Sequence, residues 1–145
     1  MRRRLALLLV AAVVGCEAQQ RELPGVRPEA LRAEAEGFAT AFLEQLDAGE
    51  IAETWPLVAH NVQERADEAT WTKVLGESRE ALGALRERAL REYEYSEDVP
   101  EAPPGSYFVF DFESVFEDGD AVERVVCFLE GGERWRVAGY FTTKK

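Results

Sequence analysis

The side chain with the most distinctive chemistry is the thiol of Cys16, because it directly follows an apolar segment near the start of the chain. Residues 2–4 are arginines, Leu5–Val14 is an uninterrupted apolar run, and Gly15 lies between this run and the cysteine. A basic segment, a short apolar segment and a small residue at its end are the three parts of a secretory signal peptide. The run is too short to remain as a membrane-spanning helix, which needs about 20 apolar residues.

The residues Val13-Val14-Gly15-Cys16 resemble a bacterial lipobox. In that motif the cysteine thiol accepts a diacylglyceryl group, the leader is cleaved before the cysteine, and the new amino group is acylated. We therefore expect a lipoprotein signal peptide over residues 1–15 and lipidation at Cys16, with a plain secretory signal as the alternative. Two or more acyl chains give stable anchoring, so the expected location is the cell envelope, on the periplasmic or outer side of a membrane.

A second group of polar residues lies beside apolar neighbours on predicted helices and strands. Its members are Arg79, Arg88, Glu113, Glu123, Arg136 and Tyr140. If the fold brings some of them together, they would form a polar floor for a ligand, and Arg79, Arg88, Glu123 and Tyr140 are the candidates for lining such a pocket. Alternatively they pair across strands as surface ions, each worth a fraction of a kcal/mol. We favour this structural interpretation.

Other chemistries lack the residues that they require. His60 is the single histidine, so a zinc site lacks its ligand set. The acidic turn of residues 117–120 lacks the ligand spacing of a calcium loop. Cys127 lies in an apolar run, as expected of a buried, inert thiol. With no Gly-rich phosphate loop and no nucleophile motif either, we expect no metal, no cofactor and no catalytic residue.

The charge balance narrows the choice of partners. The chain has 17 basic and 28 acidic residues, a formal charge of −11, and loss of the three arginines at residues 2–4 would make it more negative still. Nucleic-acid binding depends on neutralising phosphates with Lys and Arg, so we expect no nucleic-acid partner. The expected partners are the membrane, through the lipid anchor, and a protein or other component of the envelope.

The pattern of apolar residues predicts helices first. Residues 16–27 read as a flexible tether, and residues 28–145 as one domain. A helix begins at Pro28 and ends near Gly49, with an apolar stripe of Leu31, Ala35, Phe38, Phe42 and Leu46. A short helix carrying Ile51 and Trp55 follows. A third helix is capped by Asp67, stops at Gly83 and turns Trp71, Val74, Leu75, Ser78 and Leu82 inward.

The second half of the chain predicts strands. Phe108, Phe110 and Phe112 alternate with other residues, and turns at 117–120 and 131–132 separate two further segments, which indicates an antiparallel meander. In the last segment we expect Trp135, Val137, Gly139 and Phe141 on one side. By propensity alone, residues 85–95 could instead form a charged helix.

Several short motifs, taken in order, resemble the bacterial family called domain of unknown function 4019. They are Leu46-Asp47-Ala48-Gly49 with Thr54-Trp55, Trp71 with Arg79, Leu82-Gly83-Ala84-Leu85 with Arg88, Pro104-Gly105-Ser106-Tyr107, Val122-Glu123-Arg124-Val125, and Gly132-Glu133-Arg134-Trp135-Arg136-Val137-Ala138-Gly139-Tyr140. The resemblance covers residues 30–143. It implies an α+β, NTF2-like or cystatin-like cone, with N-terminal helices packed on a curved four-stranded antiparallel sheet. It also implies that residues 85–95 form the first strand, which we adopt.

The family carries no established activity, so the resemblance implies a fold and leaves function to other arguments. We expect a non-catalytic binding or accessory module tethered to a membrane surface. The alternative is a protein with a small-molecule pocket, or an enzyme of the NTF2-like kind. A deep cavity with a desolvated carboxylate facing a Tyr or Arg would favour the alternative.

Overall fold

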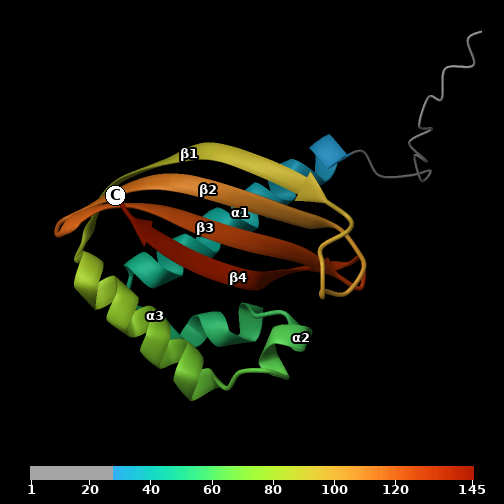
Figure 1. Ribbon diagram of the computed structural model, residues 1–145, viewed down its shortest axis with the longest axis horizontal. Coiled ribbons are helices and arrows are strands. Elements are labelled where there is room, and N and C mark those ends of the chain that lie inside the picture. Colours follow the sequence, from blue (N-terminus) through green and yellow to red (C-terminus); the bar gives the residue numbers. More distant parts are fainter. Residues whose placement is uncertain (1–27) are drawn as a thin grey trace, which may run out of the picture.

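The computed structural model describes residues 28–145, and the predicted signal peptide, Cys16 and tether lie outside this part (Figure 1). Four helices precede four strands, so the expected α+β fold is confirmed. The helices are α1 (Pro28–Asp47), the 3-10 helix η1 (Ala52–Leu57), α2 (His60–Gln63) and α3 (Glu68–Leu82). The strands are β1 (Leu85–Ser96), β2 (Tyr107–Phe116), β3 (Gly119–Glu130) and β4 (Arg134–Lys144). Among the described helices, none is long and apolar enough to cross a membrane.

Helix α1 supplies one side of the main core. Its buried residues recur every three or four positions and are Ala35, Ala39, Phe42, Leu43 and Leu46. They pack against the aromatic row of Phe108, Phe110 and Phe112 on β2. Gly49 ends this segment with a φ of 78°, in the left-handed region that glycine adopts without strain.

The strands form one antiparallel sheet in the order β1-β2-β3-β4. Figure 1 shows the sheet curving across α1, with α3 along its lower border. Residues 85–95 are strand, as the family resemblance implied. Strand β1 pairs with β2 from Leu85 opposite Phe116 to Ser96 opposite Tyr107. This pairing outweighs the helical propensity of the segment, because tertiary context overrides such a weak preference.

Strand β4 corrects one prediction about the sheet. Val126 pairs with Gly139 and Cys127 pairs with Val137, so Ala138 is an extra residue in a β-bulge. A bulge reverses the side-chain alternation beyond it. Val137 and Tyr140 therefore pack with the core beside α1, whereas Phe141, which we expected on the same side as Val137, is 59% exposed.

Helix α3 begins and ends as predicted but buries a narrower face. The Asp67 side chain accepts a 2.7 Å hydrogen bond from the backbone nitrogen of Thr70, and Gly83 ends the helix with a φ of 74°. Trp71, Leu75 and Leu82 are buried, but Val74, predicted to face inward, is 55% exposed. The helix lies at the border of the sheet and packs mainly on η1, so only a narrow stripe is covered.

Candidate functional site

The centre of the candidate site is Glu123, whose side chain is fully buried. The residue lies in the middle of β3, where alternation turns Ala121, Glu123, Val125 and Cys127 toward the interior. A buried carboxylate is costly unless hydrogen bonds and opposite charges replace its water. The surroundings of Glu123 must therefore supply donors.

Four side chains from four elements donate hydrogen bonds to Glu123. Arg79 Nη2 from α3 and the Tyr140 hydroxyl from β4 reach Oε1, at 2.8 and 2.7 Å. Arg88 Nε from β1 reaches Oε2 at 2.7 Å, and the Ser114 hydroxyl from β2 donates to the same oxygen. Both carboxylate oxygens are thus occupied, each by one arginine and one hydroxyl.

Asp47, the last residue of α1, completes the arrangement. Its Oδ1 accepts from Arg79 Nη1 at 2.8 Å and from Arg88 Nη2 at 2.9 Å, while its Oδ2 accepts from Arg88 Nη1 at 2.6 Å. Two arginines therefore bridge two carboxylates, and the four charges balance. We call the set the Glu123 cluster: Asp47, Arg79, Arg88, Ser114, Glu123 and Tyr140.

Aromatic rings cover the Glu123 cluster on its apolar side. The guanidinium carbon of Arg79 lies 5.3 Å from the ring centre of Phe116 and 5.7 Å from that of Tyr140. The ring of Tyr140 also packs edge-on against Phe42, with centres 5.6 Å apart. These contacts help to hold Arg79 in place, because the faces of aromatic rings attract cations.

The environment shifts the pKa of two groups in the cluster. Burial raises the pKa of Tyr140 above its ordinary value, and the neighbouring negative charge of Glu123 raises it further. For Arg88, burial opposes the charged form, but the hydrogen bond to Asp47 and the charges of Glu123 and Asp47 outweigh it and raise the pKa. At neutral pH the tyrosine is protonated and the arginine is charged.

A family model described as "Protein of unknown function (DUF4019)" matches residues 38–140. The chain belongs to this family. The matched segment runs from within α1 to Tyr140, so it includes all six residues of the Glu123 cluster. Among curated proteins and among solved structures, nothing matches the chain. For the DUF4019 domain, function must therefore be argued from its own geometry.

The four residues singled out in the sequence all meet in the Glu123 cluster of the DUF4019 domain. Sequence reasoning missed Asp47 and Ser114. Asp47 was placed at the end of the first helix, where a surface carboxylate is common, and was therefore not considered as a site residue. Ser114 had a usable signal, because it lies between Phe112 and Phe116 in the alternation of β2 and must face inward with them.

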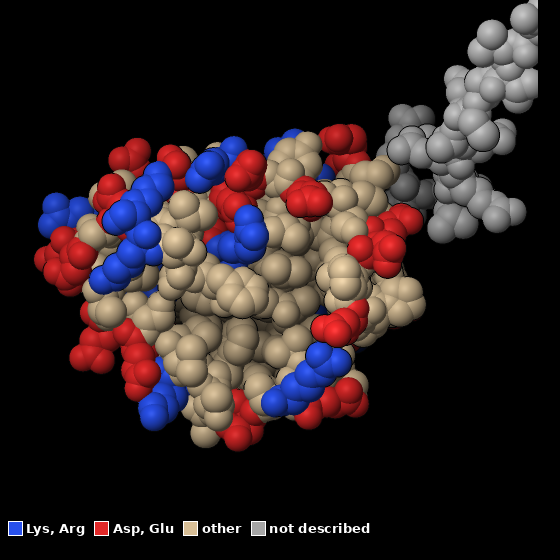
Figure 2. Space-filling view, in the orientation of Figure 1, with Lys and Arg blue, Asp and Glu red and all other residues tan. Residues whose placement is uncertain are grey.

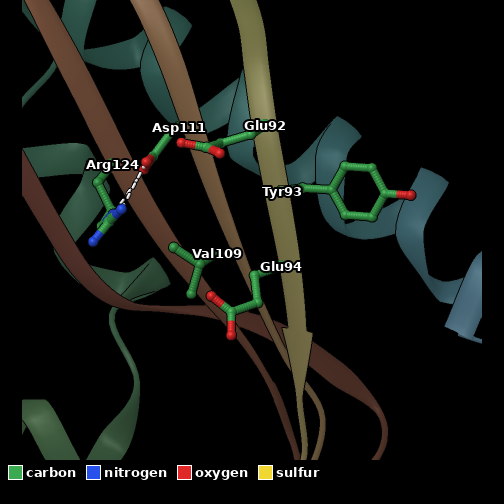
Figure 3. Close-up of a pocket in the computed structure, with 6 residues that line it drawn as sticks. All are labelled: Glu92, Tyr93, Glu94, Val109, Asp111 and Arg124. Carbon is green, nitrogen blue, oxygen red and sulfur yellow. Dashed lines mark hydrogen bonds and ion pairs between the residues drawn. The ribbon is translucent and has the colours of Figure 1, made fainter.

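The two surface hollows of the DUF4019 domain that we describe lie away from these four residues. One of 310 Å³ lies on the sheet and is lined by Glu92, Tyr93, Glu94, Val109, Asp111 and Arg124 (Figure 3). The other, of 440 Å³, is lined by His60, Asn61, Glu64, Pro103, Pro104, Phe128, Glu130 and Gly131. Lining of a ligand pocket by Arg79, Arg88, Glu123 and Tyr140 therefore stays a prediction.

Other residues considered in the sequence have ordinary surroundings. Cys127 is fully buried, and burial raises the pKa of its thiol well above the usual range, so the reactive thiolate does not form near neutral pH. His60 is the first residue of α2, lies at the surface, and has Nε2 3.5 Å from Oε1 of Glu64. Within residues 28–145, no group of three or more His, Cys, Asp or Glu side chains is arranged to hold a metal ion.

Proposed function

We propose that this DUF4019 protein is a non-catalytic binding or accessory module, anchored by lipid in the cell envelope. The observation that carries the proposal is that both carboxylates of the Glu123 cluster are fully hydrogen-bonded within it. Every oxygen of Asp47 and Glu123 accepts a hydrogen bond from a neighbour within the cluster. Such a network joins α1 and α3 to the sheet, and it leaves no carboxylate oxygen unoccupied.

The pKa shifts of Tyr140 and Arg88 also argue against general acid–base catalysis by the cluster. A catalytic acid or base works best when its pKa lies near the operating pH. The pKa of Tyr140 is instead raised by burial and by Glu123, so the phenol keeps its proton at neutral pH. The pKa of Arg88 is raised as well, so it acts as a fixed charge. These directions suit a structural network better than a proton-transfer site.

The anchoring part of the proposal rests on the sequence of residues 1–27. The lipobox-like segment and Cys16 would place the lipid, and the polar segment up to residue 27 would connect it to the domain. Fully extended, residues 17–27 would span at most about 40 Å. An acidic domain is repelled by anionic lipid headgroups, which would leave its surface open to a partner in the envelope.

The alternative, a small-molecule pocket protein or enzyme, draws on the same cluster. Glu123 is a desolvated carboxylate facing a tyrosine and two arginines, which is the lining that such a pocket would use. A ligand would have to displace some of these internal bonds. The two functions therefore differ in whether the hydrogen bonds within the Glu123 cluster break to admit a ligand.

A turnover and binding screen separates the two functions. The full chain in a nonionic detergent would be tested with a panel of small metabolites, beside Arg88→Ala and Tyr140→Phe. Arg86→Ala and Tyr93→Phe are matched controls, because they make the same changes at exposed positions of β1. We expect no turnover by any form. Turnover that disappears in the cluster variants and persists in the controls would overturn the proposal.

A further inference from the structure

The sheet has a second face, opposite α1, that carries a different set of side chains. Strand pairing places them in three rows: Glu94, Val109, Val126 and Gly139; Glu92, Asp111, Arg124 and Phe141; and Ala89, Glu113, Val122 and Thr143. We call this the outer face. In Figure 1 it is turned toward the viewer, and the described helices lie behind the sheet or along its border.

The outer face holds more negative charge than the cations beside it balance, because Arg91, Arg124 and Lys145 pair with Glu92, Asp111 and Glu113 and leave Glu94. Arg124 donates from Nε and Nη2 to the two oxygens of Asp111, at 2.7 and 2.6 Å. Glu92 has a long contact of 3.8 Å to Arg91, and both side chains are at least half exposed. Glu94 makes no ion pair or side-chain hydrogen bond with the rest of residues 28–145. Glu92 is thus partly balanced by Arg91, and among residues 28–145 Glu94 is a carboxylate without an ion-pair partner beside a pair that is already neutral.

These charges surround the hollow of 310 Å³. Figure 3 shows Glu92, Glu94, Asp111 and Arg124 on one side of β1, whereas Tyr93 points to the other side. The hollow lies on an uncovered part of the sheet, so a side chain from outside could enter it. The charge excess favours a cation there.

An apolar area adjoins the acidic hollow. Phe141 is 59% exposed and pairs in register with Arg124. Its ring lies over Gly139, where an added Cβ would be 2.9 Å from a ring carbon, and Val126 is a further neighbour of that position. Figure 2 shows uncharged surface across the middle of the same view, with charged side chains around it. Aromatic residues are enriched at the centre of protein interfaces, where a polar rim surrounds them.

We propose that the outer face binds a basic, partly apolar segment of an envelope protein. An Arg or Lys side chain of this segment enters the hollow beside Glu92 and Glu94, and an adjoining apolar side chain packs on Phe141. The occupant is chosen by charge complementarity to the hollow and to a chain with a formal charge of −11. The inference rests on the proposed binding function and names the chemistry of its partner.

The test uses synthetic peptides and the full chain in a nonionic detergent at low ionic strength. The probe is a fluorescent peptide of alternating lysine and valine, and affinity is measured by anisotropy. Two comparison peptides replace either lysine with glutamate or valine with serine. We expect the lysine–valine peptide to bind tightest, and its affinity to fall as salt is added.

Paired variants locate the site. Glu92→Gln with Glu94→Gln should weaken lysine–valine binding by about fivefold or more. Glu77→Gln with Glu80→Gln removes the same charge from exposed positions of α3 and should change it little. Phe141→Ser should weaken binding of the lysine–valine peptide more than that of the lysine–serine peptide, since only the former has an apolar side chain for the ring.

Three results would overturn the inference: no binding of the lysine–valine peptide, equal losses in the β1 and α3 pairs, or no effect of Phe141→Ser. The first two would mean that the outer face is not the site or that attraction follows net charge alone, and the third that the apolar contact is absent. None of them alters the turnover result. Turnover of a small molecule would overturn the proposed function without changing the peptide affinities, so the two failures are distinguishable.

Discussion

Tyr140 donates a 2.7 Å hydrogen bond to Oε1 of Glu123, although its partner in strand register is Val125. The contact is diagonal across β3 and β4, within the reach of a long aromatic side chain. It depends on the bulge at Ala138, because regular alternation from Val137 would turn Tyr140 outward. One extra residue in β4 thus decides whether the buried carboxylate has its fourth donor.

Replacing Tyr140 with Phe removes this hydrogen bond and keeps the ring against Phe42. Because the acceptor is charged, we expect the free energy of unfolding to fall by about 1.5–3 kcal/mol in urea denaturation. Tyr93→Phe, at an exposed position, is the control and should change it by less than about 0.5 kcal/mol. Equal changes in the two variants would contradict the role given to the Tyr140 hydroxyl.

Tyr140 should also make stability depend on alkaline pH. Burial and Glu123 raise its pKa in the folded state above the ordinary value of 10.0. The folded chain then holds a proton that the unfolded chain releases, so this contribution is fully present below about pH 10 and is lost as the pH rises further. The difference in unfolding free energy between wild type and Tyr140→Phe should shrink over that range, with phenolate absorbance reporting ionisation. A constant difference would argue against the raised pKa.

Removing either Glu123 or Arg79 from the ion network should lower the free energy of unfolding. The effects of the two substitutions should not be additive. Glu123→Ala leaves two mostly buried arginines without one carboxylate, and we expect a loss of about 3–5 kcal/mol. Arg79→Ala should also destabilise. The double variant should lose less than the sum of the single losses, because each change already removes their shared contact. Strict additivity in urea denaturation would mean that the two side chains are not coupled.

The regular parts of this fold could be predicted from the sequence, because they follow local rules. The apolar stripe of α1 and the caps at Asp67 and Gly83 depend on neighbours a few residues away. Strand β1 could not be predicted from propensity, since its state is set by pairing with β2 along its whole length. The resemblance to the family supplied that information instead.

For the candidate site, the sequence identified most of the residues but not the way in which they come together. Arg79, Arg88, Glu123 and Tyr140 could be singled out because each is polar beside apolar neighbours. Their convergence depends on the curvature of the sheet and on the bulge in β4, which no local pattern reveals. The same bulge explains why Phe141, expected on the same side as Val137, is exposed on the opposite side. Asp47 was missed because its role depends on where α1 ends relative to β1.

Phe42 tests the main core. Its side chain projects from α1, is fully buried, and contacts the rings of Trp71 and Tyr140. Phe42→Ala removes a large ring and leaves a cavity, so we expect a loss of about 3–5 kcal/mol by chemical denaturation. Val74→Ala, on the exposed side of α3, should cost much less. A shift below about 1 kcal/mol for Phe42→Ala would mean that the core relaxes around the missing ring.

Cys127 should be unreactive in the folded chain, because burial raises the pKa of its thiol and shields its sulfur from reagents. A Cys16→Ser chain has Cys127 as its single thiol. Its reaction with a disulfide reagent should be slow in buffer and rapid in denaturant. A fast native reaction would contradict the packing of β3 against α1, where Cys127 Sγ lies 3.9 Å from the carbonyl oxygen of Ala35.

The lipid anchor is tested at Cys16, which lies outside the described residues. Wild type expressed in its native host should partition with membranes and incorporate labelled palmitate. Cys16→Ser should lose the label and show altered gel mobility, because serine offers no thiol for the diacylglyceryl group. Cys127→Ser is the matched control: it also removes one thiol, and it should leave label and partitioning unchanged. A Cys16→Ser chain that stays in membranes with unchanged mobility, together with an unlabelled wild type, would overturn the anchor and with it the envelope location.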